Sequence, residues 1–553
     1  MHPAKRKLAL GLLVLVPFLG LTGCEDDEAT GPTNTAPVIN AITAATTSTT
    51  MTATVEVAAD VTDEDGDTLR YRWSATKGTI SQTSAAGDSI EWTAPDEQGI
   101  VTLTLEVDDG VNITTGTVDI GVDVYVPSVQ PYFVGDSSCE GCHAAAHTGW
   151  ASTAHAAASK DPEYCSACHN TGWDETVDNG GYDEVQLASL QGVQCESCHG
   201  PGSAHVSTRD AADIEMTLDA ASCQSCHESP HNTLFTDWAA TAHAGGGSVV
   251  GYPGGGRAGC SLCHSGTGYV DYIETGSDAA YADPEPINCT ACHDPHSAEN
   301  RQQLRTGQNV TLPGGEVVDF SKAGLGLLCL NCHTGRRGPA GIEDQLVNGS
   351  AHFGPHHGNQ GGIFYADVVV RDVAPAGFVW SETRHREIED GCVTCHMGGE
   401  TGGMTGHSFE VATEACEPCH GTIETFDDII AKNDYDGDGN VSGVQTEVHH
   451  LVDDLVAAIV ATGIDTSGIS GDSDVDVIVS AVGADDTTTA IWGGLDPAYS
   501  PYEVRQSAWN LAAVSFDHSY GVHNAALVIQ LLQQSIKYMG GTLPGKELVE
   551  GGF

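Results

Sequence analysis

The chain has 553 residues and carries 76 acidic against 21 basic side chains, which gives a formal net charge of −55. A surface this acidic repels nucleic acid and anionic lipid, so no binding to nucleic acid is expected, and it attracts cations or a basic partner. General solubility accounts for the charge better than a specific partner does, so the charge by itself indicates no specific substrate.

The first residues resemble the signal of an exported lipoprotein. A basic start is followed by an apolar run that is too short for a membrane-spanning helix and fits a secretory signal peptide. The run ends in LTGC, which is similar to the lipobox of bacterial lipoproteins, and Cys24 is the one cysteine outside the CxxC pairs. We therefore expect a signal peptide over 1–23, an acylated Cys24 with a flexible tether over 24–35, and attachment to a membrane surface.

Residues 36–126 show the short alternating pattern of β-strands, separated by turn residues at the spacing of a sandwich. The stretches DEDGDTLRYRWSATKG and EWTAPDEQGIVTLTLEVDDG resemble bacterial immunoglobulin-like and PKD-type repeats, which implies a spacer or a protein contact. Trp73 and Trp92 are expected to help fill the core. One turn offers three carboxylates, which indicate either a calcium site or a solvated acidic turn: Asp63, Asp65 and Asp67.

The region 127–425 contains nine CxxC pairs, and each pair is followed directly by histidine. C-x-x-C-H is the attachment signature of c-type haem, because two thioethers and one proximal imidazole must meet one rigid macrocycle. Half of a zinc site or a redox dithiol needs no histidine at the next position. We therefore expect nine covalently bound haems c. The attachment cysteines are Cys139, Cys142, Cys165, Cys168, Cys195, Cys198, Cys223, Cys226, Cys260, Cys263, Cys289, Cys292, Cys329, Cys332, Cys392, Cys395, Cys416 and Cys419, and the proximal ligands are His143, His169, His199, His227, His264, His293, His333, His396 and His420.

The haem load of this region predicts its architecture. Nine cofactors between Cys139 and His420 leave little room for an ordinary hydrophobic core, and aromatic residues make up only 6% of the chain. We expect short helices that carry the motifs, long connections between them, and neighbouring haems in close contact.

The stretch CESCHGPGSAH contains two histidines that are expected to serve different irons. The Gly-Pro-Gly step between them turns the chain away from His199, so His205 is better placed as the distal ligand of another haem. Together with the segments WASTAHA, WAATAHA, CTACHDPHS, GPHHGNQ, CVTCHM and GVHN, this stretch resembles the multihaem cytochrome c superfamily. That superfamily includes tetrahaem carriers, octahaem hydroxylamine-oxidising and tetrathionate-reducing enzymes, and pentahaem nitrite reductases.

The resemblance implies eight distal histidines for the nine irons. They are His155, His205, His243, His296, His356, His385, His407 and His523. For the ninth iron His231 is favoured, and its rivals are His147, His352, His357, His449, His450 and His518.

Residues 426–553 contain no CxxCH motif and are expected to be helical. The stretches VHHLVDDLVAAIVATG and HNAALVIQLLQQSIKYM show helical periodicity. The region resembles the helical tail that packs on the haem core of multihaem cytochromes, which implies that the last helix delivers His523.

The stretch NDYDGDGNVSGVQTE resembles an EF-hand or dockerin calcium loop. Asp434, Asp436 and Asp438 occupy positions one, three and five, where such loops place calcium ligands. Position twelve is Gln445 in place of glutamate, and Glu447 follows two residues later. A calcium site and a plain acidic turn are both open on the sequence.

The predicted fold is multidomain, with an N-terminal β-sandwich, a mainly α or irregular multihaem core and a helical C-terminal region. An iron with two histidine ligands passes electrons but has no free position for a substrate. Because c-type haem is attached outside the cytoplasm in bacteria, the sequence predicts an exported lipoprotein that conducts electrons in anaerobic or extracellular respiration. It would act at the outer membrane, on the periplasmic face or at the cell surface. Its partners would be donor and acceptor proteins, extracellular metal oxides, or further copies in an oligomer or filament.

The alternative prediction is enzymatic. A multihaem reductase of nitrite, hydroxylamine or a sulfur oxyanion would leave one iron without a distal ligand. All nine motifs end in histidine, so the lysine variant of pentahaem nitrite reductases is absent from the sequence.

Overall fold

The computed structural model describes residues 34–126, 130–160, 163–174, 177, 179–183, 186–216, 219–228, 232–244, 258–282, 284–349, 353–398, 400–401, 404–463, 501–543 and 545–549. The chain divides into two compact units, Met1–Val126 and Pro127–Phe553. The expected signal peptide, Cys24 and most of the tether lie outside the described residues, as do His231 and His352.

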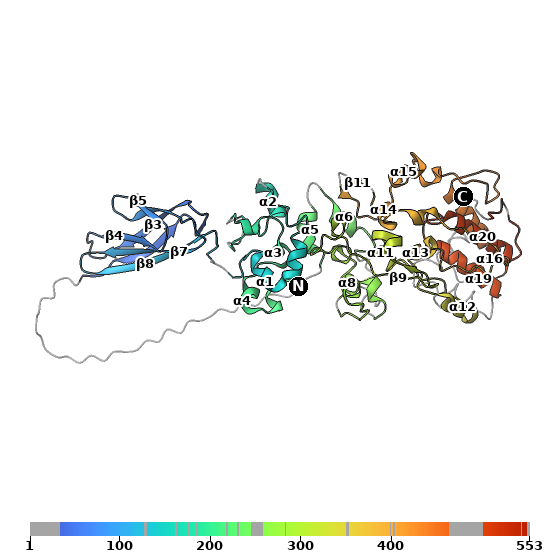
Figure 1. The fold of residues 1–553 in the computed structure, drawn as a ribbon, viewed down its shortest axis with the longest axis horizontal. Coiled ribbons are helices and arrows are strands. Elements are labelled where there is room, and N and C mark those ends of the chain that lie inside the picture. The colour runs from blue at the N-terminus through green and yellow to red at the C-terminus, as the bar shows by residue number, and fades with distance from the viewer. Residues whose placement is uncertain are drawn as a thin grey trace, which may run out of the picture. The chain divides into compact units, whose positions relative to one another are not determined.

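The first unit is a sandwich of two four-stranded sheets, which confirms the predicted β-sandwich. Their strand orders are β1-β3-β6-β5 and β2-β8-β7-β4, and all pairings are antiparallel except that of β2 with β8 (Figure 1). Alternate side chains of β7 are buried, as expected when one face of a sheet covers a core. The strands are β1 (Val38–Ala44), β2 (Ser48–Thr49), β3 (Thr54–Thr62), β4 (Arg70–Ala75), β5 (Thr79–Gln82), β6 (Ser89–Thr93), β7 (Gly99–Asp108) and β8 (Ile113–Val122).

Two tryptophans contribute to the sandwich core, as predicted. Trp92 is fully buried, and its indole N–H donates to a main-chain carbonyl at 3.0 Å. Trp73 is partly buried against the same cluster and donates to another carbonyl at 2.9 Å. The close packing leaves no room at Gly78, where an added Cβ would lie 2.4 Å from the carbonyl oxygen of Thr93.

The second unit carries its CxxCH motifs on short helices, as the sequence predicts. These helices are α1 (Ser137–Trp150), α2 (Glu163–His169), α3 (Cys195–His199), α5 (Ala221–His227), α7 (Ser261–His264), α9 (Cys289–Cys292), α11 (Leu327–Leu330), α14 (Cys392–His396) and α15 (Glu417–His420). One helical turn brings residues three and four apart onto the same face, so both cysteines and the histidine of a motif can meet one ligand.

Small elements connect the motif helices. The helices are α4 (Ser203–Thr208), α6 (Leu234–Ala239), α8 (Gly266–Thr275), α10 (Phe320–Ala323), α12 (Pro339–Asn348) and α13 (Gln360–Phe364), and the strands are β9 (Val310–Thr311), β10 (Val317–Val318), β11 (Glu400–Thr401) and β12 (Met404–Thr405). Single 3-10 turns occur at Ala188–Leu190, Ala211–Asp213, Arg301–Gln303, Gly324–Gly326, Arg384–Glu387, Thr413–Ala415 and Phe426–Asp428. Within the described residues, no helix combines the length and the apolar character that a membrane span requires.

Three longer helices pack together near the C-terminus: α16 (Val444–Ala461), α19 (Tyr502–Ser515) and α20 (Ala525–Tyr538) (Figure 1). The two predicted helical stretches correspond to α16 and α20. Helix α19 shows no amphipathic pattern because its polar side chains are buried with its apolar ones. Asn510, for example, is fully buried and exchanges two hydrogen bonds with the backbone of Val370.

Candidate haem sites

Eight of the nine motif histidines face a second histidine across a gap of nearly constant width. We number the sites 1 to 9 in the order of their motifs along the chain. The ring centres, with the motif histidine first, are 6.1 Å apart for His143–His205 (site 1), 6.1 Å for His199–His296 (site 3), 6.0 Å for His227–His155 (site 4), 6.0 Å for His264–His356 (site 5), 6.1 Å for His293–His407 (site 6), 6.0 Å for His333–His243 (site 7), 6.2 Å for His396–His523 (site 8) and 6.2 Å for His420–His385 (site 9).

This gap fits one metal ion held between two imidazoles. A ring nitrogen binds a metal at about 2 Å, and each ring centre lies roughly 1 Å behind its nitrogen, so two ligands of one iron have centres about 6 Å apart. Direct stacking of two rings gives shorter distances, such as the 3.8 Å between His449 and Tyr520. The residues present therefore fit a haem with two axial histidines at each of the eight sites.

The two histidines of CESCHGPGSAH face different partners. His199 faces His296, whereas His205, on α4, faces His143. Between them, Gly200 has a φ of +71°, a conformation that favours glycine. The turn is held by buried Glu196, whose carboxylate accepts hydrogen bonds from the backbone of Gly202 at 2.6 Å and of the preceding segment at 134–135. Burial raises the pKa of Glu196, against the effect of these hydrogen bonds.

Hydrogen bonds fix many of these rings in the tautomer that metal binding needs. A main-chain carbonyl accepts from Nδ1, at 2.7 to 2.9 Å, in seven cases: His169, His199, His205, His293, His356, His385 and His396. Because a carbonyl oxygen only accepts, the proton resides on Nδ1 and the lone pair of Nε2 is free for a metal. His333 is held in the same way by the amide oxygen of Gln360 at 3.0 Å.

Burial also keeps most of the paired imidazoles neutral. It lowers the pKa of His243 and of His356 to about 4. It lowers the pKa of eight further ring members of the pairs: His155, His227, His264, His293, His296, His333, His385 and His396. A neutral imidazole is the form that binds a metal, so little competition from protons is expected at neutral pH. For His523 burial also acts to lower the pKa, but the Asp517 carboxylate outweighs it and the pKa is raised.

Cysteines of different motifs lie near one another and indicate which sites are neighbours. Thiols lie close enough to shift each other's pKa at sites 1 and 3 (Cys139 with Cys195), 2 and 4 (Cys168 with Cys226), 4 and 6 (Cys223 with Cys289), 5 and 7 (Cys263 with Cys332) and 7 and 8 (Cys329 with Cys392). Cysteines within electrostatic range also join sites 3 and 4 (Cys198 with Cys223), 6 and 7 (Cys292 with Cys329) and 8 and 9 (Cys395 with Cys416). The nine sites therefore form one connected series, 1-3-4-6-7-8-9, with site 2 beside site 4 and site 5 beside site 7.

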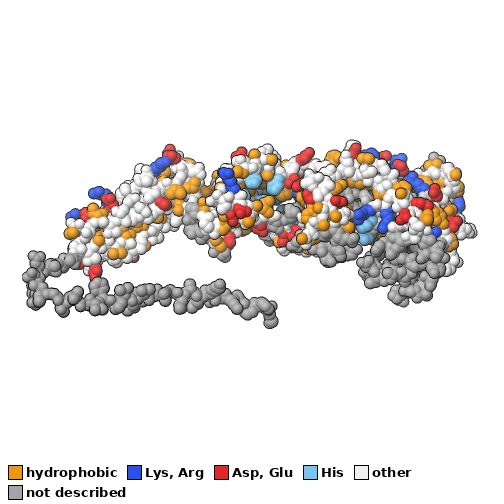
Figure 2. All heavy atoms as spheres, turned by 90° about the horizontal axis from the view of Figure 1, so that it is seen from below, with side chains coloured by type: hydrophobic (Ala, Val, Ile, Leu, Met, Phe, Trp, Pro, Cys, Tyr) orange, Lys and Arg blue, Asp and Glu red, His pale blue; other side chains and the backbone are white. Residues whose placement is uncertain are grey.

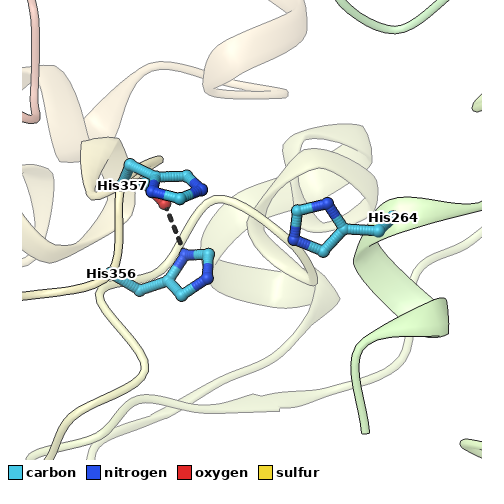
Figure 3. Close-up of side chains that lie close together, drawn as sticks. All are labelled: His264, His356 and His357. Atoms are coloured by element: carbon cyan, nitrogen blue, oxygen red, sulfur yellow. Dashed lines mark hydrogen bonds between the residues drawn. The ribbon is translucent and has the colours of Figure 1, made fainter. Parts of the chain in front are cut away.

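At site 5, two histidines lie opposite the motif histidine His264. Figure 3 shows His356 and His357 facing His264, and ring nitrogens of all three lie within 4.8 Å of one another. His356 is nearer, because the ring centre of His357 is 6.5 Å from that of His264. Nδ1 of His356 is also held by the carbonyl of His357. Distance and tautomer both favour His356 as the partner of His264.

Site 2 is the exception to the pairing. Within the described part of the chain, no second imidazole faces His169, and the favoured partner His231 lies outside that part. Two rivals are engaged elsewhere, since His147 pairs with Asp136 at 3.1 Å and His450 with Asp436 at 2.5 Å.

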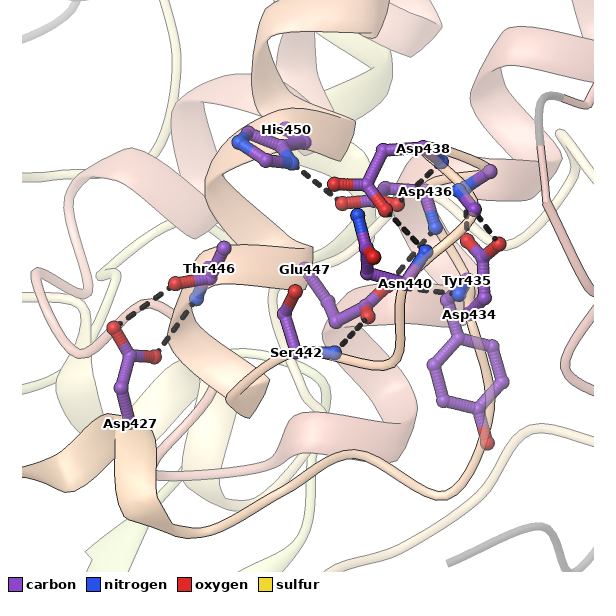
Figure 4. A network of polar contacts seen from close by, with 12 residues as sticks. Asp427, Asp434, Tyr435, Asp436, Asp438, Asn440, Ser442, Thr446, Glu447 and His450 are labelled. Atoms are coloured by element: carbon purple, nitrogen blue, oxygen red, sulfur yellow. Dashed lines mark hydrogen bonds and ion pairs between the residues drawn. The ribbon is translucent and has the colours of Figure 1, made fainter.

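The EF-hand-like loop gathers carboxylates around buried Glu447 (Figure 4). Oxygens of Asp434, Asp436 and Glu447 lie within 4.8 Å of one another, and oxygens of Asp436 and Asp438 form a similar group with His450. Gln445 points elsewhere and donates to the carbonyl of Ser519 at 3.0 Å. Glu447, at position fourteen, therefore faces the loop in place of position twelve, and its carboxylate accepts hydrogen bonds from the backbone of Tyr435 and Asp436 at 2.8 and 3.0 Å.

The acidic turn of the first unit is also compact. Carboxylate oxygens of Asp63, Asp65 and Asp67 lie within 4.8 Å of one another, and Asp63 accepts hydrogen bonds from the backbone of the other two. These hydrogen bonds are those of an ordinary turn.

Some supporting residues carry no sequence signal. Glu196 and Glu140 occupy the same motif position, yet only Glu196 is buried. Arg305 is 9% exposed and lies beside site 6, where it donates to a carbonyl at 2.8 Å and pairs with Asp294 at 3.9 Å. Asp517 binds the ring of His523 from the loop before α20. No motif marks these positions, and Glu196 in addition binds the backbone of a segment about sixty residues earlier in the chain.

Family models match three parts of the chain. The bacterial Ig domain model matches residues 34–121, the cytochrome c554 and c-prime model matches 138–200, and the doubled CXXCH motif model matches 284–338. The chain is 36% identical over 94 residues to cytochrome c-554 of Nitrosomonas europaea, which covers 13% of this chain and 39% of that protein. It is 23% identical over 204 residues to the multiheme cytochrome MtrA of Shewanella baltica. This alignment covers 32% of this chain and 55% of that protein.

Two solved structures are similar over about three quarters of the chain. One is the undecaheme cytochrome from the S-layer of Carboxydothermus ferrireducens, with a TM-score of 0.46 and 19% identity over 75% of this chain and 70% of that one. The other is the outer cell wall cytochrome OcwA, with a TM-score of 0.47 and 17% identity over 74% of this chain and 99% of that one. The CxxCH helices and histidine pairs are typical of c-type cytochromes. The family matches show multihaem cytochrome c motifs in the second unit and a bacterial immunoglobulin domain in the first.

Proposed function

We propose that the chain is a nonahaem electron-transfer conduit. The observation that carries the proposal is that eight motif histidines face a second histidine at the separation of two ligands on one iron, in sites that form one connected series. His231 is proposed as the second ligand at site 2. When bound, each haem carries one electron by changing between the ferric and ferrous states.

The side chains determine what this arrangement can do. Two histidines would hold each haem iron at the eight paired sites, which would leave no position for a substrate there. The second imidazole, in place of methionine, favours a low reduction potential. Cysteines of different motifs lie near one another, so neighbouring haems would be close, which is the condition for passing electrons along the series.

The proposal extends to location and partners on sequence grounds. Acylation of Cys24 would hold the chain on the outer membrane, at its periplasmic face or at the cell surface. The immunoglobulin domain would act as a spacer or a protein contact. Electron donors and acceptors would be other redox proteins or extracellular metal oxides, and copies of the chain can associate as an oligomer or filament.

We also propose calcium in the EF-hand-like loop, with Asp434, Asp436 and Asp438 as ligands. Support comes from the buried Glu447, which supplies the carboxylate that the sequence pattern lacks at position twelve.

The alternative is a multihaem reductase of nitrite, hydroxylamine or a sulfur oxyanion. It would require an open iron, for example at site 2, whose proposed second ligand His231 lies outside the described residues.

The composition of the mature protein tests the first part of the proposal. We expect an intact mass equal to residues 24–553 plus nine haems and an acylated N-terminus, with the haem retained after denaturation. Cys24→Ala is the control, and it should remove the lipid while leaving nine haems. Extraction of the colour by acid–acetone would contradict covalent attachment.

A further inference from the structure

His523 differs from eight other motif and facing histidines in the partner of its Nδ1 nitrogen. In seven of the motif and facing histidines that partner is a neutral main-chain carbonyl, and in His333 it is a neutral side-chain amide. In His523 it is a carboxylate, because Nδ1 donates to Oδ1 of Asp517 at 2.6 Å. The Nδ1 nitrogen of His523 is therefore hydrogen-bonded to a negatively charged group, whereas Nδ1 of these other histidines is hydrogen-bonded to a neutral one.

The carboxylate is well shielded from water. The side chain of Asp517 is 1% exposed, and it lies in the loop between α19 and α20. Its second oxygen accepts a hydrogen bond from the hydroxyl of Ser519, which in turn accepts from the backbone N–H of His523 at 3.2 Å. Both oxygens of the Asp517 carboxylate are therefore held, one by the imidazole and the other by Ser519. Because the carboxylate is buried, water does not screen its charge.

We propose that Asp517 makes site 8 a low-potential step in the series of haems. A carboxylate that accepts from the far nitrogen of a ligating histidine makes that ligand a stronger donor. A stronger donor and a nearby negative charge both stabilise ferric over ferrous iron, so the site is reduced less readily. The inference rests on the proposed role of His523 as an axial ligand. Site 8 stands between sites 7 and 9, so every electron that travels the full series would cross this step.

The chain offers a matched comparison at site 3. His296 also lies near a carboxylate, but its Nδ1 is 3.9 Å from Asp294, which is too long for a hydrogen bond. The side chain of Asp294 is 30% exposed, and Arg305 lies 3.9 Å from its other oxygen. Distance, solvent and the cation all weaken the effect of Asp294 on its site.

A redox titration of the full-length, haem-loaded protein tests the inference. We expect Asp517→Asn to raise the reduction potential of one component of the titration. The equilibrium constant for reducing that haem should rise at least tenfold, which corresponds to about 59 mV for a one-electron couple. The other components should keep their potentials, and EPR should show every paired haem still low-spin. Asp517→Glu, which keeps the charge, should stay close to the wild type, and Asp294→Asn should give a smaller shift than Asp517→Asn.

Two outcomes would overturn the inference. One is an unchanged titration curve in a folded, low-spin Asp517→Asn variant. The other is a haem that turns high-spin in this variant, because Asp517 would then only position the ring. His523→Ala separates this failure from a failure of the proposed function. If His523→Ala creates one high-spin haem while Asp517→Asn shifts nothing, the ligand assignment survives and only the tuning role is lost.

Discussion

His523 shows how one side chain is prepared to bind a metal. One ring nitrogen is held by Asp517, the other is free, and the ring centre lies 6.2 Å from that of the motif histidine His396. The same combination of a held Nδ1 and a facing ring recurs at His205, His356 and His385 with carbonyl partners. Each of these residues should therefore be needed for the spin state of one iron and of no other.

His523→Ala should convert one low-spin haem to the high-spin state and create a site that binds carbon monoxide when reduced. The reason is that Ala removes the sixth ligand at site 8 and leaves the motif histidine in place. His450→Ala is the control, because His450 is hydrogen-bonded to Asp436 and should not affect any haem. An unchanged spectrum in a folded His523→Ala variant would mean that the last helix only packs on the core.

The second histidines also show how much of the site could be predicted from the sequence. Short motifs predicted eight second histidines, and each of them lies opposite a motif histidine, although their role as ligands stays a prediction. The sequence could not indicate which histidine faces which motif. His155 follows the first motif, yet it faces His227 of site 4, and His407 faces His293. Such pairings depend on the path of the chain through space.

At the scale of elements, one buried glutamate ties three segments together. Glu196 accepts hydrogen bonds from the backbone of Val134, Gly135 and Gly202, and so it fixes the turn that leads to α4 and His205. Removing it would leave three backbone donors without their acceptor in a largely buried place.

Glu196→Ala should therefore lower the free energy of unfolding by about 3 kcal/mol, since hydrogen bonds to charged groups contribute about 1.5–3 kcal/mol each and are not additive. The midpoint of denaturant unfolding measures this loss. In a fraction of the molecules the haem at site 1 should also become high-spin, because Glu196 no longer fixes the turn that positions His205. Glu140→Ala changes the same motif position in α1 at an exposed residue, and it should have little effect on either measurement. Equal effects of the two substitutions would contradict this role.

The loop before α16 gives a second prediction at this scale. If it binds calcium, chelation should lower the melting temperature of the protein, and Glu447→Ala should abolish the difference between the chelated and the calcium-loaded samples. Gln445→Ala should leave the calcium response intact, because that side chain points away from the loop. If the effect of chelation on the melting temperature were lost in Gln445→Ala and kept in Glu447→Ala, the role of Glu447 in calcium binding would be contradicted.

Elements were predictable where a periodic pattern marked them. The alternation of the strands and the apolar stripes of α16 and α20 are visible in the sequence, and the CxxCH spacing predicts short helices. Helix α19 gives no such signal, because Asn510 and Ser507 are buried within it and are bound to Val370 and Ser535. A polar side chain in a core is satisfied by partners that are distant in sequence, and a local pattern cannot reveal them.

At the scale of the whole molecule, charge and cofactor sites have separate roles. Figure 2 shows acidic side chains spread over the visible face, with histidine side chains exposed among them. The net charge of −55 favours cations or a basic partner but indicates no particular one. The continuous series of sites, and not the charge, therefore carries the proposed function. The fold class could be predicted from the sequence, whereas the order of the sites along the series could not, because it depends on contacts between distant motifs.

The most direct test of the conduit is a count of high-spin and low-spin haem by EPR on the oxidised, purified protein. We expect low-spin signals only, because each of the nine motif histidines would be joined by a second imidazole, with His231 completing site 2. The same preparation should exchange electrons with an electrode or a soluble ferric complex and should turn over neither nitrite, hydroxylamine nor tetrathionate. His231→Ala should create one high-spin haem in nine and so calibrates the measurement. A high-spin fraction near one haem in nine in the unmodified protein, with steady reduction of any of those three substrates, would contradict the proposed conduit.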